Sequence, residues 1–475
     1  MGRRKEFPLL EKVRITDIGA EGNALARVDN LVVFVPMLIP GDLVDIRVIR
    51  KRKKYLEGRV VKFHEYSADR IVARCIYFGT CGGCRWQHLP YPLQLKYKEK
   101  QVCDNLKRIG KIDLPAISPI IKSAEEYLYR NKLEYTFSDK RWYTAEEVKS
   151  GITFEKEPAL GFHIPGLYDK VLDIEECHLQ PEPSNSIKNS VRKYAIENGL
   201  SFFDLKEQKG FLRNIVIRNA LDGSVMVVLV FFHEDEAKRK GLMDFLAAAY
   251  PEITSLHYII NTKKNASLGD QDPVLYRGSD HLTEEMDGLK FRIGAKSFYQ
   301  TNTRQAIVLY RIARDFAGLT GREVVYDLYT GTGTIANYVA GSAQKVIGIE
   351  YVDEAVKDAR INSGINNITN TLFFSGDMKD VLTEKFIAEN GAPDVIITDP
   401  PRAGMHEGVV KAIIHAKPQK VVYVSCNPST QARDILLMSQ DYAVARVQPV
   451  DMFPHTHHVE NVVLLRRIMN KGASV

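Results

Sequence analysis

The sequence predicts an α/β protein built from an OB-like β-barrel over residues 1–66, a central α+β domain over 67–295 and a Rossmann-like domain over 296–475. Three features of the chain lead to this prediction. Short apolar runs separated by turn residues fill the first part, a cysteine-rich stretch opens the second, and strands alternate with helices in the third. The length of 475 residues also exceeds what one hydrophobic core normally serves.

Composition and charge are those of a soluble globular protein with a mild basic excess. Hydrophobic residues make up 45% of the chain and charged residues 26%, and 65 Lys and Arg against 59 Asp and Glu give a net charge of +6. Residues 1–66 contain 14 Lys and Arg against 9 Asp and Glu, so most of the excess lies in the predicted barrel. A local basic surface favours a partner with a phosphate backbone over a small metabolite.

The chain lacks the patterns of a secreted or membrane protein. Six cysteines in 475 residues do not form a secreted disulfide framework, and the first residues lack the apolar core of a signal peptide. The longest apolar runs, Leu31–Pro40 and Val225–Phe232, are too short to span a bilayer. We therefore expect a cytoplasmic monomer that does not bind membranes.

Residues 1–66 have the strand spacing of a small barrel. Strands at this spacing are typical of OB-like folds, which commonly bind oligonucleotides. The basic cluster Arg50–Lys54 falls where a hairpin loop is expected and is suited to phosphates, although a solvated charged turn explains it equally well. The expected strands are Val13–Ile18, Ala24–Val28, Leu31–Val35, Val44–Arg50 and Gly58–Phe63.

A cysteine cluster opens the central part. Cys75, Cys81 and Cys84 have the spacing C-x5-C-x2-C, and Cys177 supplies a fourth thiol. Four thiolates suit tetrahedral zinc or an iron–sulfur cluster, and one tight group of three with a distant fourth favours the iron–sulfur cluster. Cys103 stands apart in a predicted amphipathic helix, and we expect it in the core.

Strand-like runs that are interrupted by cations follow the cysteines. Cations with Tyr and Phe nearby would suit the binding of unpaired RNA, but the outer face of an antiparallel sheet has the same composition. The interrupting residues are Arg130, Asn131, Lys132, Arg213 and Asn214. The expected strands are Tyr127–Phe137, Ala159–His163, Phe211–Arg218 and Ser224–Phe232.

The last part has the β-α alternation of a nucleotide-binding domain. Val324–Leu328 leads into the glycine loop Tyr329–Thr334, and the next strand, Lys345–Ile349, ends at the acidic Glu350. Glycines let a cofactor approach the backbone, and the acid accepts hydrogen bonds from ribose hydroxyls. The loop lacks the third glycine of the dinucleotide fingerprint, which favours S-adenosylmethionine (SAM) over NAD. Later elements are expected at Val352–Asn362, Thr371–Phe374, Val395–Thr398, Val421–Ser425, Val444–Val450 and Asn461–Arg466.

Three stretches point reactive side chains at the crevice where such sheets bind ligands. Val421–Thr430 carries Cys426 at the end of a buried strand, Asp399–Gly404 carries Asp399 and Arg402, and Asp451–Glu460 ends in a carboxylate. A thiol, an arginine and two carboxylates are the groups needed for covalent chemistry on an electron-poor ring.

These stretches resemble a known family. The motifs D-P-P-R-A-G, V-V-Y-V-S-C-N-P-S-T and D-M-F-P-H-T-H-H-V-E are similar to both signatures of the RNA 5-methyluridine methyltransferases. The cysteine spacing is similar to the iron–sulfur branch of that family, and the barrel resembles the TRAM domain of that branch. The resemblance covers essentially the whole chain.

The resemblance implies a SAM-dependent methyltransferase domain, RNA as partner, and roles for particular residues. It implies a 4Fe–4S cluster on Cys75, Cys81, Cys84 and Cys177. It implies SAM contacts by Gln300, Tyr329, Glu350, Asp377 and Asp399. It also implies a nucleophilic Cys426 and a proton-accepting Glu460.

The chemistry at uracil C5 requires these residue types. Thiolate addition at C6 makes C5 nucleophilic enough to attack a methyl group, and a carboxylate must then remove the C5 proton. Since a free thiol is mostly protonated at neutral pH, Cys426 needs a nearby positive charge, and we expect Arg402 to supply it. Asp399 and Gln300 would orient the ring and the cofactor, and the uridine must leave its stack.

Two other functions remain open from the sequence. D-P-P also occurs in enzymes that methylate exocyclic amines, which need no cysteine. A non-catalytic iron–sulfur RNA-binding assembly factor would have no use for Cys426 with Glu460. We expect methylation of uridine C5 in RNA, with 23S ribosomal RNA favoured over transfer RNA because the longer form of the family resembles ribosomal RNA enzymes.

Overall fold

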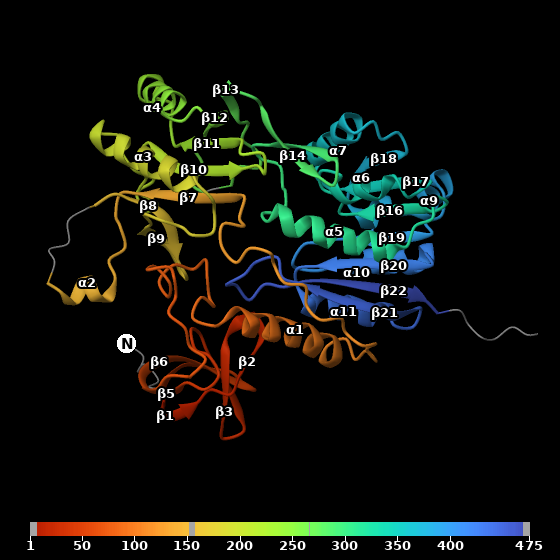
Figure 1. Ribbon diagram of the computed structural model, residues 1–475, viewed down its shortest axis with the longest axis horizontal. Coiled ribbons are helices and arrows are strands. Elements are labelled where there is room, and N and C mark those ends of the chain that lie inside the picture. The colour runs from red at the N-terminus through yellow and green to blue at the C-terminus, as the bar shows by residue number, and fades with distance from the viewer. Residues whose placement is uncertain (1–6, 152–156, 266, 469–475) are drawn as a thin grey trace, which may run out of the picture.

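Figure 1 shows the computed structural model of the chain, which describes residues 7–151, 157–265 and 267–468. The long helix α1 (Tyr91–Arg108) lies between the N-terminal barrel and the C-terminal sheet, and the central sheet lies at the upper left of the view. Residues 1–6, on which the expected absence of a signal peptide partly rests, lie outside the described residues. No helix in the described ranges is both long enough and apolar enough to cross a membrane.

The barrel is a sheet with the strand order β1-β5-β6-β4-β3-β2. Alternate side chains of β5, among them Val44, Ile46 and Val48, are buried inside it, as the period-two pattern predicts. The strand expected at Val13–Ile18 is instead two strands, because Ile15 leaves the ladder and donates its N–H to Asp42 O. The elements are β1 (Leu9–Arg14), β2 (Asp17–Ile18), the 3-10 turn η1 (Ala20–Gly22), β3 (Ala24–Val28), β4 (Leu31–Val35), β5 (Leu43–Lys51) and β6 (Tyr55–Glu65).

The central sheet has the order β13-β12-β11-β10-β7-β8-β9 and is mixed rather than antiparallel, since β11 and β12 pair in parallel. Helices α3 and α4 pack on one face of it. The strand expected at Tyr127–Phe137 begins only at Lys132, because Leu128 and Arg130 donate their N–H groups to the carbonyls of His178 and Leu179. The elements are β7 (Lys132–Ser138), α2 (Ala145–Lys149), β8 (Ala159–Ile164), β9 (Leu167–Asp173), α3 (Ser184–Glu197), β10 (Leu212–Asn219), β11 (Val225–Phe231), α4 (Glu236–Ala249), β12 (Ile253–Ile260), β13 (Val274–Gly278) and the hairpin β14 (His281–Met286) and β15 (Leu289–Gly294).

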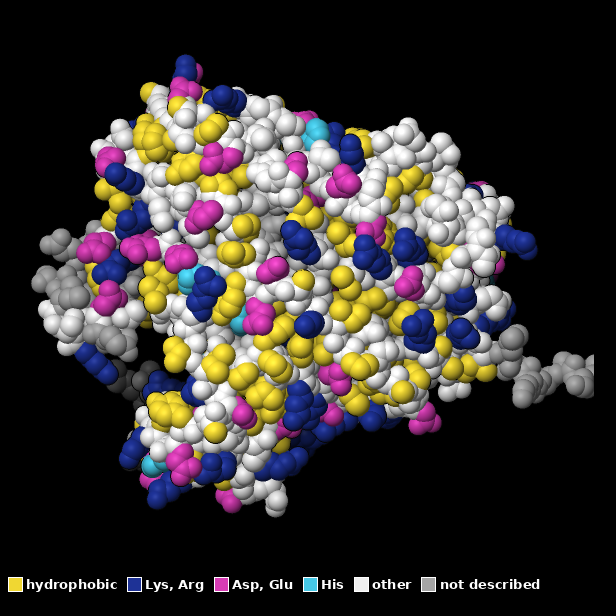
Figure 2. Space-filling model, viewed as in Figure 1, with side chains coloured by type: hydrophobic (Ala, Val, Ile, Leu, Met, Phe, Trp, Pro, Cys, Tyr) yellow, Lys and Arg dark blue, Asp and Glu magenta, His cyan; other side chains and the backbone are white. Residues whose placement is uncertain are grey.

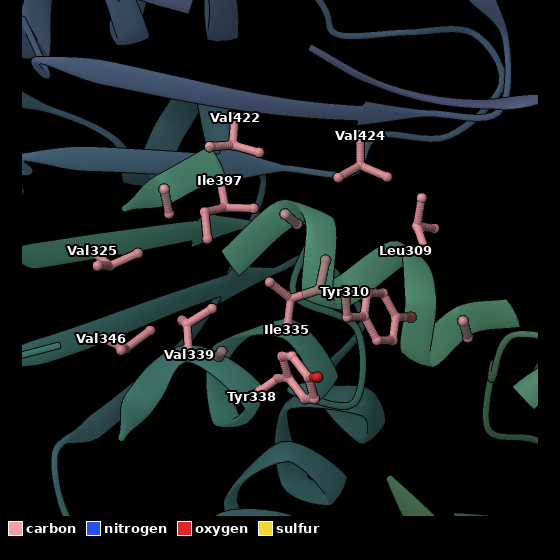
Figure 3. Close-up of a cluster of buried hydrophobic side chains, with 14 of the residues drawn as sticks. Leu309, Tyr310, Val325, Ile335, Tyr338, Val339, Val346, Ile397, Val422 and Val424 are labelled. Atoms are coloured by element: carbon pink, nitrogen blue, oxygen red, sulfur yellow. The ribbon is translucent and has the colours of Figure 1, made fainter. Parts of the chain in front are cut away.

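The C-terminal sheet has the order β18-β17-β16-β19-β20-β22-β21, with β22 antiparallel to both of its neighbours. Helices cover both faces, and Figure 3 shows the apolar cluster between α5, α6 and the sheet. The elements are α5 (Thr303–Ala317), β16 (Val324–Leu328), α6 (Thr334–Ala340), β17 (Lys345–Glu350), α7 (Asp353–Ile365), β18 (Thr371–Ser375), α8 (Met378–Val381), α9 (Glu384–Asn390), β19 (Val395–Thr398), α10 (Glu407–Ala416), β20 (Lys420–Ser425), α11 (Pro428–Met438), β21 (Tyr442–Val450) and β22 (Glu460–Arg467).

Helix α1 packs on the C-terminal sheet although it precedes the central one in sequence. Val102 and Leu106 are fully buried in the core that also contains the strands β16, β20 and β22. Lys98 Nζ donates to Asp451 Oδ1 at 2.6 Å, and both side chains are fully buried. Tyr91 donates its hydroxyl to the other carboxylate oxygen of Asp451 at 2.8 Å. The segment that leads to Glu460 is thereby fixed to this helix.

Candidate active site

A cleft of about 1550 Å³ lies at the carboxyl ends of the C-terminal strands. Its walls come from the loops that follow β16, β17, β18, β19 and β20, and from the hairpin region before α5. The structure brings together all the reactive and cofactor-binding side chains that the sequence predicts here. They are Gln300, Tyr329, Glu350, Asp377, Asp399, Arg402, Cys426 and Glu460.

Cys426 lies in the sharp bend between β20 and α11. Asn427 caps the helix, since its side-chain oxygen accepts the N–H of Ser429 at 3.1 Å. The amide nitrogen of Asn427 donates to Arg402 O at 2.9 Å and so joins this bend to the neighbouring loop. The bend leaves the Cys426 side chain half-buried at the cleft.

Hydrogen bonds to residues of α11 hold the loop after β19 in place. Asp434 accepts the N–H of Met405 at 2.8 Å, and Arg433 donates to the carbonyls of Ala403 and Met405. Gly404 has a φ of +76°, and a Cβ there would lie 2.6 Å from the Arg433 guanidinium, so only glycine fits. This support fixes the backbone that carries Asp399 and Arg402.

Glu460 is the first residue of β22. Ser425, the last residue of β20, pairs with Asn461 of β22, so Glu460 lies beside Cys426, the residue that follows β20. Its side chain is 4% exposed. Burial, together with the nearby Asp399, raises the pKa of Glu460 to about 8, while Arg402 opposes this shift. Burial likewise raises the pKa of Asp399 to about 7.

Three neighbouring charged side chains affect the pKa of the Cys426 thiol. Burial, together with Glu460 and Asp399, raises its pKa to about 11, while Arg402 opposes this shift. Arg402 thus opposes the other groups, as expected of a cation that favours the thiolate.

The other end of the cleft has the geometry of a cofactor site. The two oxygens of Glu350 accept the N–H groups of Gly331 and Val352, both at 3.0 Å, so this carboxylate fixes the glycine loop. Tyr329 adopts a left-handed conformation with φ +62° at the start of that loop. The backbone oxygen of Gln300 accepts a hydrogen bond from Asn131 at 2.9 Å, which ties this residue to the central part.

The structure shows residues in or under the cleft to which the sequence assigned no role in the reaction. His458 accepts a hydrogen bond from Arg402 Nη2 at 3.3 Å, and Phe298 is 74% exposed on the cleft wall. Asp327 is fully buried under the glycine loop, where Thr330 donates to it and burial raises its pKa to about 7. The position of Asp327 near the end of a strand could have indicated its role from the sequence. The contact of His458 with Arg402 could not have been predicted in this way, because it depends on how the loop folds.

The four predicted ligand cysteines line one cavity of about 990 Å³. All are half-buried free thiols, and burial raises the pKa of Cys84 to about 12 and that of Cys177 to about 11. Among the described residues, no group of three or more His, Cys, Asp or Glu side chains is arranged to hold a metal ion. This cavity adjoins the cleft, since Gly83, Arg130, Thr301 and Thr456 line both.

Three expectations outside the cleft were wrong. Arg213 is 2% exposed and donates to the carbonyls of Asn261, Lys263 and Asn265, so it holds a loop and does not face solvent. Asn214 is buried and donates to Thr136. Cys103 is only half-buried on α1 rather than in the core, because Val102 and Leu106 take the buried face of that helix.

A mainly parallel sheet with a glycine loop after its first strand, an acid at the end of the next and a cleft above both places this domain in the Rossmann-like class that binds nucleotide-type cofactors. The family model described as tRNA (Uracil-5-)-methyltransferase matches residues 211–468, and that of the TRAM domain matches residues 11–61. The chain therefore belongs to the SAM-dependent RNA uracil-5 methyltransferase family, which confirms the prediction, and its N-terminal barrel is a TRAM domain.

Several known proteins are similar over nearly the whole chain. An uncharacterized RNA methyltransferase of Bacteroides thetaiotaomicron is 58% identical and covers 94% of this chain and 99% of its own. One of Porphyromonas gingivalis is 56% identical, covering 96% and 99%. The crystal structure of Pyrococcus abyssi tRNA (uracil-54, C5)-methyltransferase with S-adenosyl-L-homocysteine is 27% identical, covers 96% of this chain and all of its own, and gives a TM-score of 0.74.

Proposed function

We propose that this protein transfers a methyl group from SAM to C5 of a uridine in RNA through a covalent bond between Cys426 and C6. One observation carries the proposal: the thiol, Arg402, the buried Glu460 and the half-buried Asp399 share a cleft with the glycine loop. The complex of the P. abyssi enzyme with S-adenosyl-L-homocysteine supports the same cofactor for this chain. We also propose that the protein is cytoplasmic and is divided into domains at residues 1–66, 67–295 and 296–475.

Cys426 and Arg402 act first in this mechanism. The sulfur of Cys426 forms a bond to C6 of the flipped uracil as a thiolate, and the electron pair of the C5–C6 double bond moves toward C5 and O4. Arg402 favours the thiolate, and its guanidinium also stabilises the developing enolate oxygen. SAM, when bound, supplies the methyl group as an electrophilic sulfonium. Asp399, together with Gln300, Tyr329, Glu350 and Asp377, orients the ring and the cofactor.

Glu460 acts second. Once C5 carries the methyl group, its proton must leave so that the C5–C6 double bond can re-form and the Cys426–C6 bond can break. Glu460 lies beside Cys426 and takes this proton as a carboxylate. Its pKa of about 8 makes it a stronger base than an exposed glutamate, at the cost of being less ionised at neutral pH.

Ribosomal RNA is the substrate that we propose, and transfer RNA is the second candidate. The TRAM domain supports RNA as the partner. The P. abyssi protein, which has nearly the same extent as this chain, acts on uracil-54 of tRNA, and this favours the second candidate.

We propose further that Cys75, Cys81, Cys84 and Cys177 hold a 4Fe–4S cluster. The donor set fits, because four free thiols line one cavity, and a four-iron cluster holds its thiolates farther apart than a single ion does. The raised thiol pKa values mean that loading the cluster must displace protons from the thiols. Methyl transfer involves no electron transfer. We therefore propose that these four cysteines and their cluster stabilise the fold or contact RNA.

The decisive experiment uses RNA that carries 5-fluorouridine. Protein purified without oxygen is incubated with SAM and either 23S ribosomal RNA or tRNA, both substituted in this way, and its peptides are analysed by mass spectrometry. Because fluorine cannot leave as a proton, the reaction should stall with RNA bound to the Cys426 peptide. A Cys103→Ala variant is the matched control and should form the same adduct.

The outcomes separate the candidates. An adduct on the Cys426 peptide with only one RNA identifies both nucleophile and substrate class. Methyl transfer to an exocyclic amine without an adduct would replace the proposal by an amino-methyltransferase. If SAM fails to bind while RNA still does, the protein is a non-catalytic RNA-binding factor.

A further inference from the structure

The turn η1 of the TRAM domain touches the loop that carries Glu460. Gly22 lies against His457, and a Cβ on Gly22 would come within 2.6 Å of His457 Cβ and 3.2 Å of the Trp86 ring. Its φ is +73°, which a side chain also disfavours. This close approach joins the first domain of the chain to the site formed by the last, through a contact unrelated to the basic side chains around the barrel in Figure 2.

Two neighbouring residues fasten this turn to the same loop. Trp86 Nε1 donates to Gly22 O at 3.1 Å, and Arg85 donates to Glu21 O at 3.2 Å. The backbone N–H groups of Arg85 and Trp86 both donate to His455 O, at 2.8 and 3.0 Å. Trp86 is 1% exposed and forms a small apolar core with Leu89 and with Ile18 and Ile39 of the barrel, so the barrel is docked firmly.

The contact continues to the reacting groups. The rings of His457 and His458 lie 4.1 Å apart, and His458 accepts a hydrogen bond from Arg402. Nδ1 of His457 is buried without a hydrogen-bond partner in the described part of the chain. Packing against Gly22 and Trp86 is therefore a principal constraint on this ring.

We infer that the turn η1 is a positioning element of the active site, which acts through His457 and His458 to hold the Arg402 guanidinium beside Cys426. This inference rests on the proposed function, in which Cys426 is the nucleophile. It gives the TRAM domain a second task besides RNA binding. Gly22, Trp86 and His457 are positioning residues, since they touch neither RNA base nor cofactor in the proposed mechanism.

The test is the Gly22→Ala variant of the full-length protein, with Gly199→Ala as matched control. Gly199 also has a positive φ, +64°, but a Cβ there would meet nothing within 4 Å, so the control carries the same backbone strain without the contact. The first readout is the rate of Cys426 alkylation by iodoacetamide against pH, without RNA or SAM. The charged groups that face the thiol are Arg402, Glu460 and Asp399.

Gly22→Ala should displace Arg402, so that its alkylation profile shifts to higher pH and adduct formation with 5-fluorouridine RNA slows about 10- to 100-fold. The dissociation constant for RNA should change less than about twofold, since no basic side chain is altered. Trp86→Phe, which keeps an aromatic ring but removes the donor to Gly22, should shift the profile in the same direction by less.

Three results would overturn the inference. One is that neither Gly22→Ala nor Trp86→Phe changes the alkylation profile or the adduct rate. Another is an equal shift in Gly199→Ala, and the third is weaker RNA binding with a normal adduct rate. Failure of the proposed function looks different, because wild-type protein would then form no adduct at Cys426 at all.

Discussion

Cys426 and the four cysteines of the adjoining cavity are all half-buried thiols whose pKa is raised by burial, yet their surroundings differ. Cys426 lies among an arginine and two carboxyl groups on loops that backbone and side-chain hydrogen bonds hold in place. The other four thiols line one cavity, and the charged neighbours that act on Cys84 there are the other three thiols. A thiol among opposed charges is suited to reaction, whereas a thiol among thiols is suited to ligation.

The strongest test of this difference is to remove the thiol that lies among charged groups. Cys426→Ala should lower the rate of RNA methylation by about 10⁴-fold or more, because no other group can form the bond to C6. RNA binding should remain, as measured by filter retention. A methylation rate within tenfold of wild type would show that Cys426 is only a packing residue and would abolish the contrast.

Glu460→Gln tests whether the carboxyl group beside Cys426 acts after the thiol. Turnover should fall about 10²- to 10⁴-fold, while a methylated Cys426–RNA adduct accumulates because its C5 proton is not removed. Wild-type turnover should rise with pH through about 8 as Glu460 ionises. A decline over that interval would contradict the assignment of the base.

The same variant should change stability in the opposite sense to activity. The folded-state pKa of Glu460 is raised from 4.5 to about 8, so the folded protein binds this proton more tightly than the unfolded chain. Its contribution to stability is complete below about pH 4.5 and is lost as the pH rises through about 8. At pH 9, Glu460→Gln should therefore be more stable than wild type by roughly 2–4 kcal/mol, and at pH 5 the gain should be small. Chemical denaturation at both values measures this.

Arg402→Lys sharpens the comparison by changing the cation but not its charge. An ammonium cannot reproduce the planar guanidinium that meets His458, so we expect turnover to fall about tenfold and the pH profile of Cys426 alkylation to move upward. Unchanged alkylation would mean that Arg402 does not act on the thiol.

Of these variants, Cys84→Ala should change the reaction rate least and the binding of iron in the cysteine-lined cavity most. We expect the purified protein to lose iron and visible absorption and to melt at a lower temperature. The rate of adduct formation per folded molecule should fall by about tenfold or less, that is, at most about 1.4 kcal/mol. A loss as large as that of Cys426→Ala would show that both groups of thiols take part in the reaction.

Local patterns predicted most of the fold and the residues of the cleft. Strands such as β3 and β4 agree with the expected ranges, because alternation and flanking turn residues determine them locally. The positions of Cys426, Arg402 and Glu460 in the cleft could be predicted because each lies in a recognisable motif next to the end of a strand. The burial of Arg213 was missed, since it depends on carbonyls about fifty residues away in sequence, and the contact between Gly22 and His457 depends on domain docking.

The buried pair of Lys98 and Asp451 has a consequence for how the chain is made. Its partners lie 353 residues apart, so at usual translation speeds the helix leaves the ribosome roughly 20 to 70 s before the strand that completes its environment. During that interval Lys98 lacks the carboxylate that it contacts in the folded protein. A fragment beginning at residue 296 would in turn expose the apolar surface that Val102 and Leu106 cover, so the C-terminal domain should be produced together with residues 91–108 to remain monodisperse.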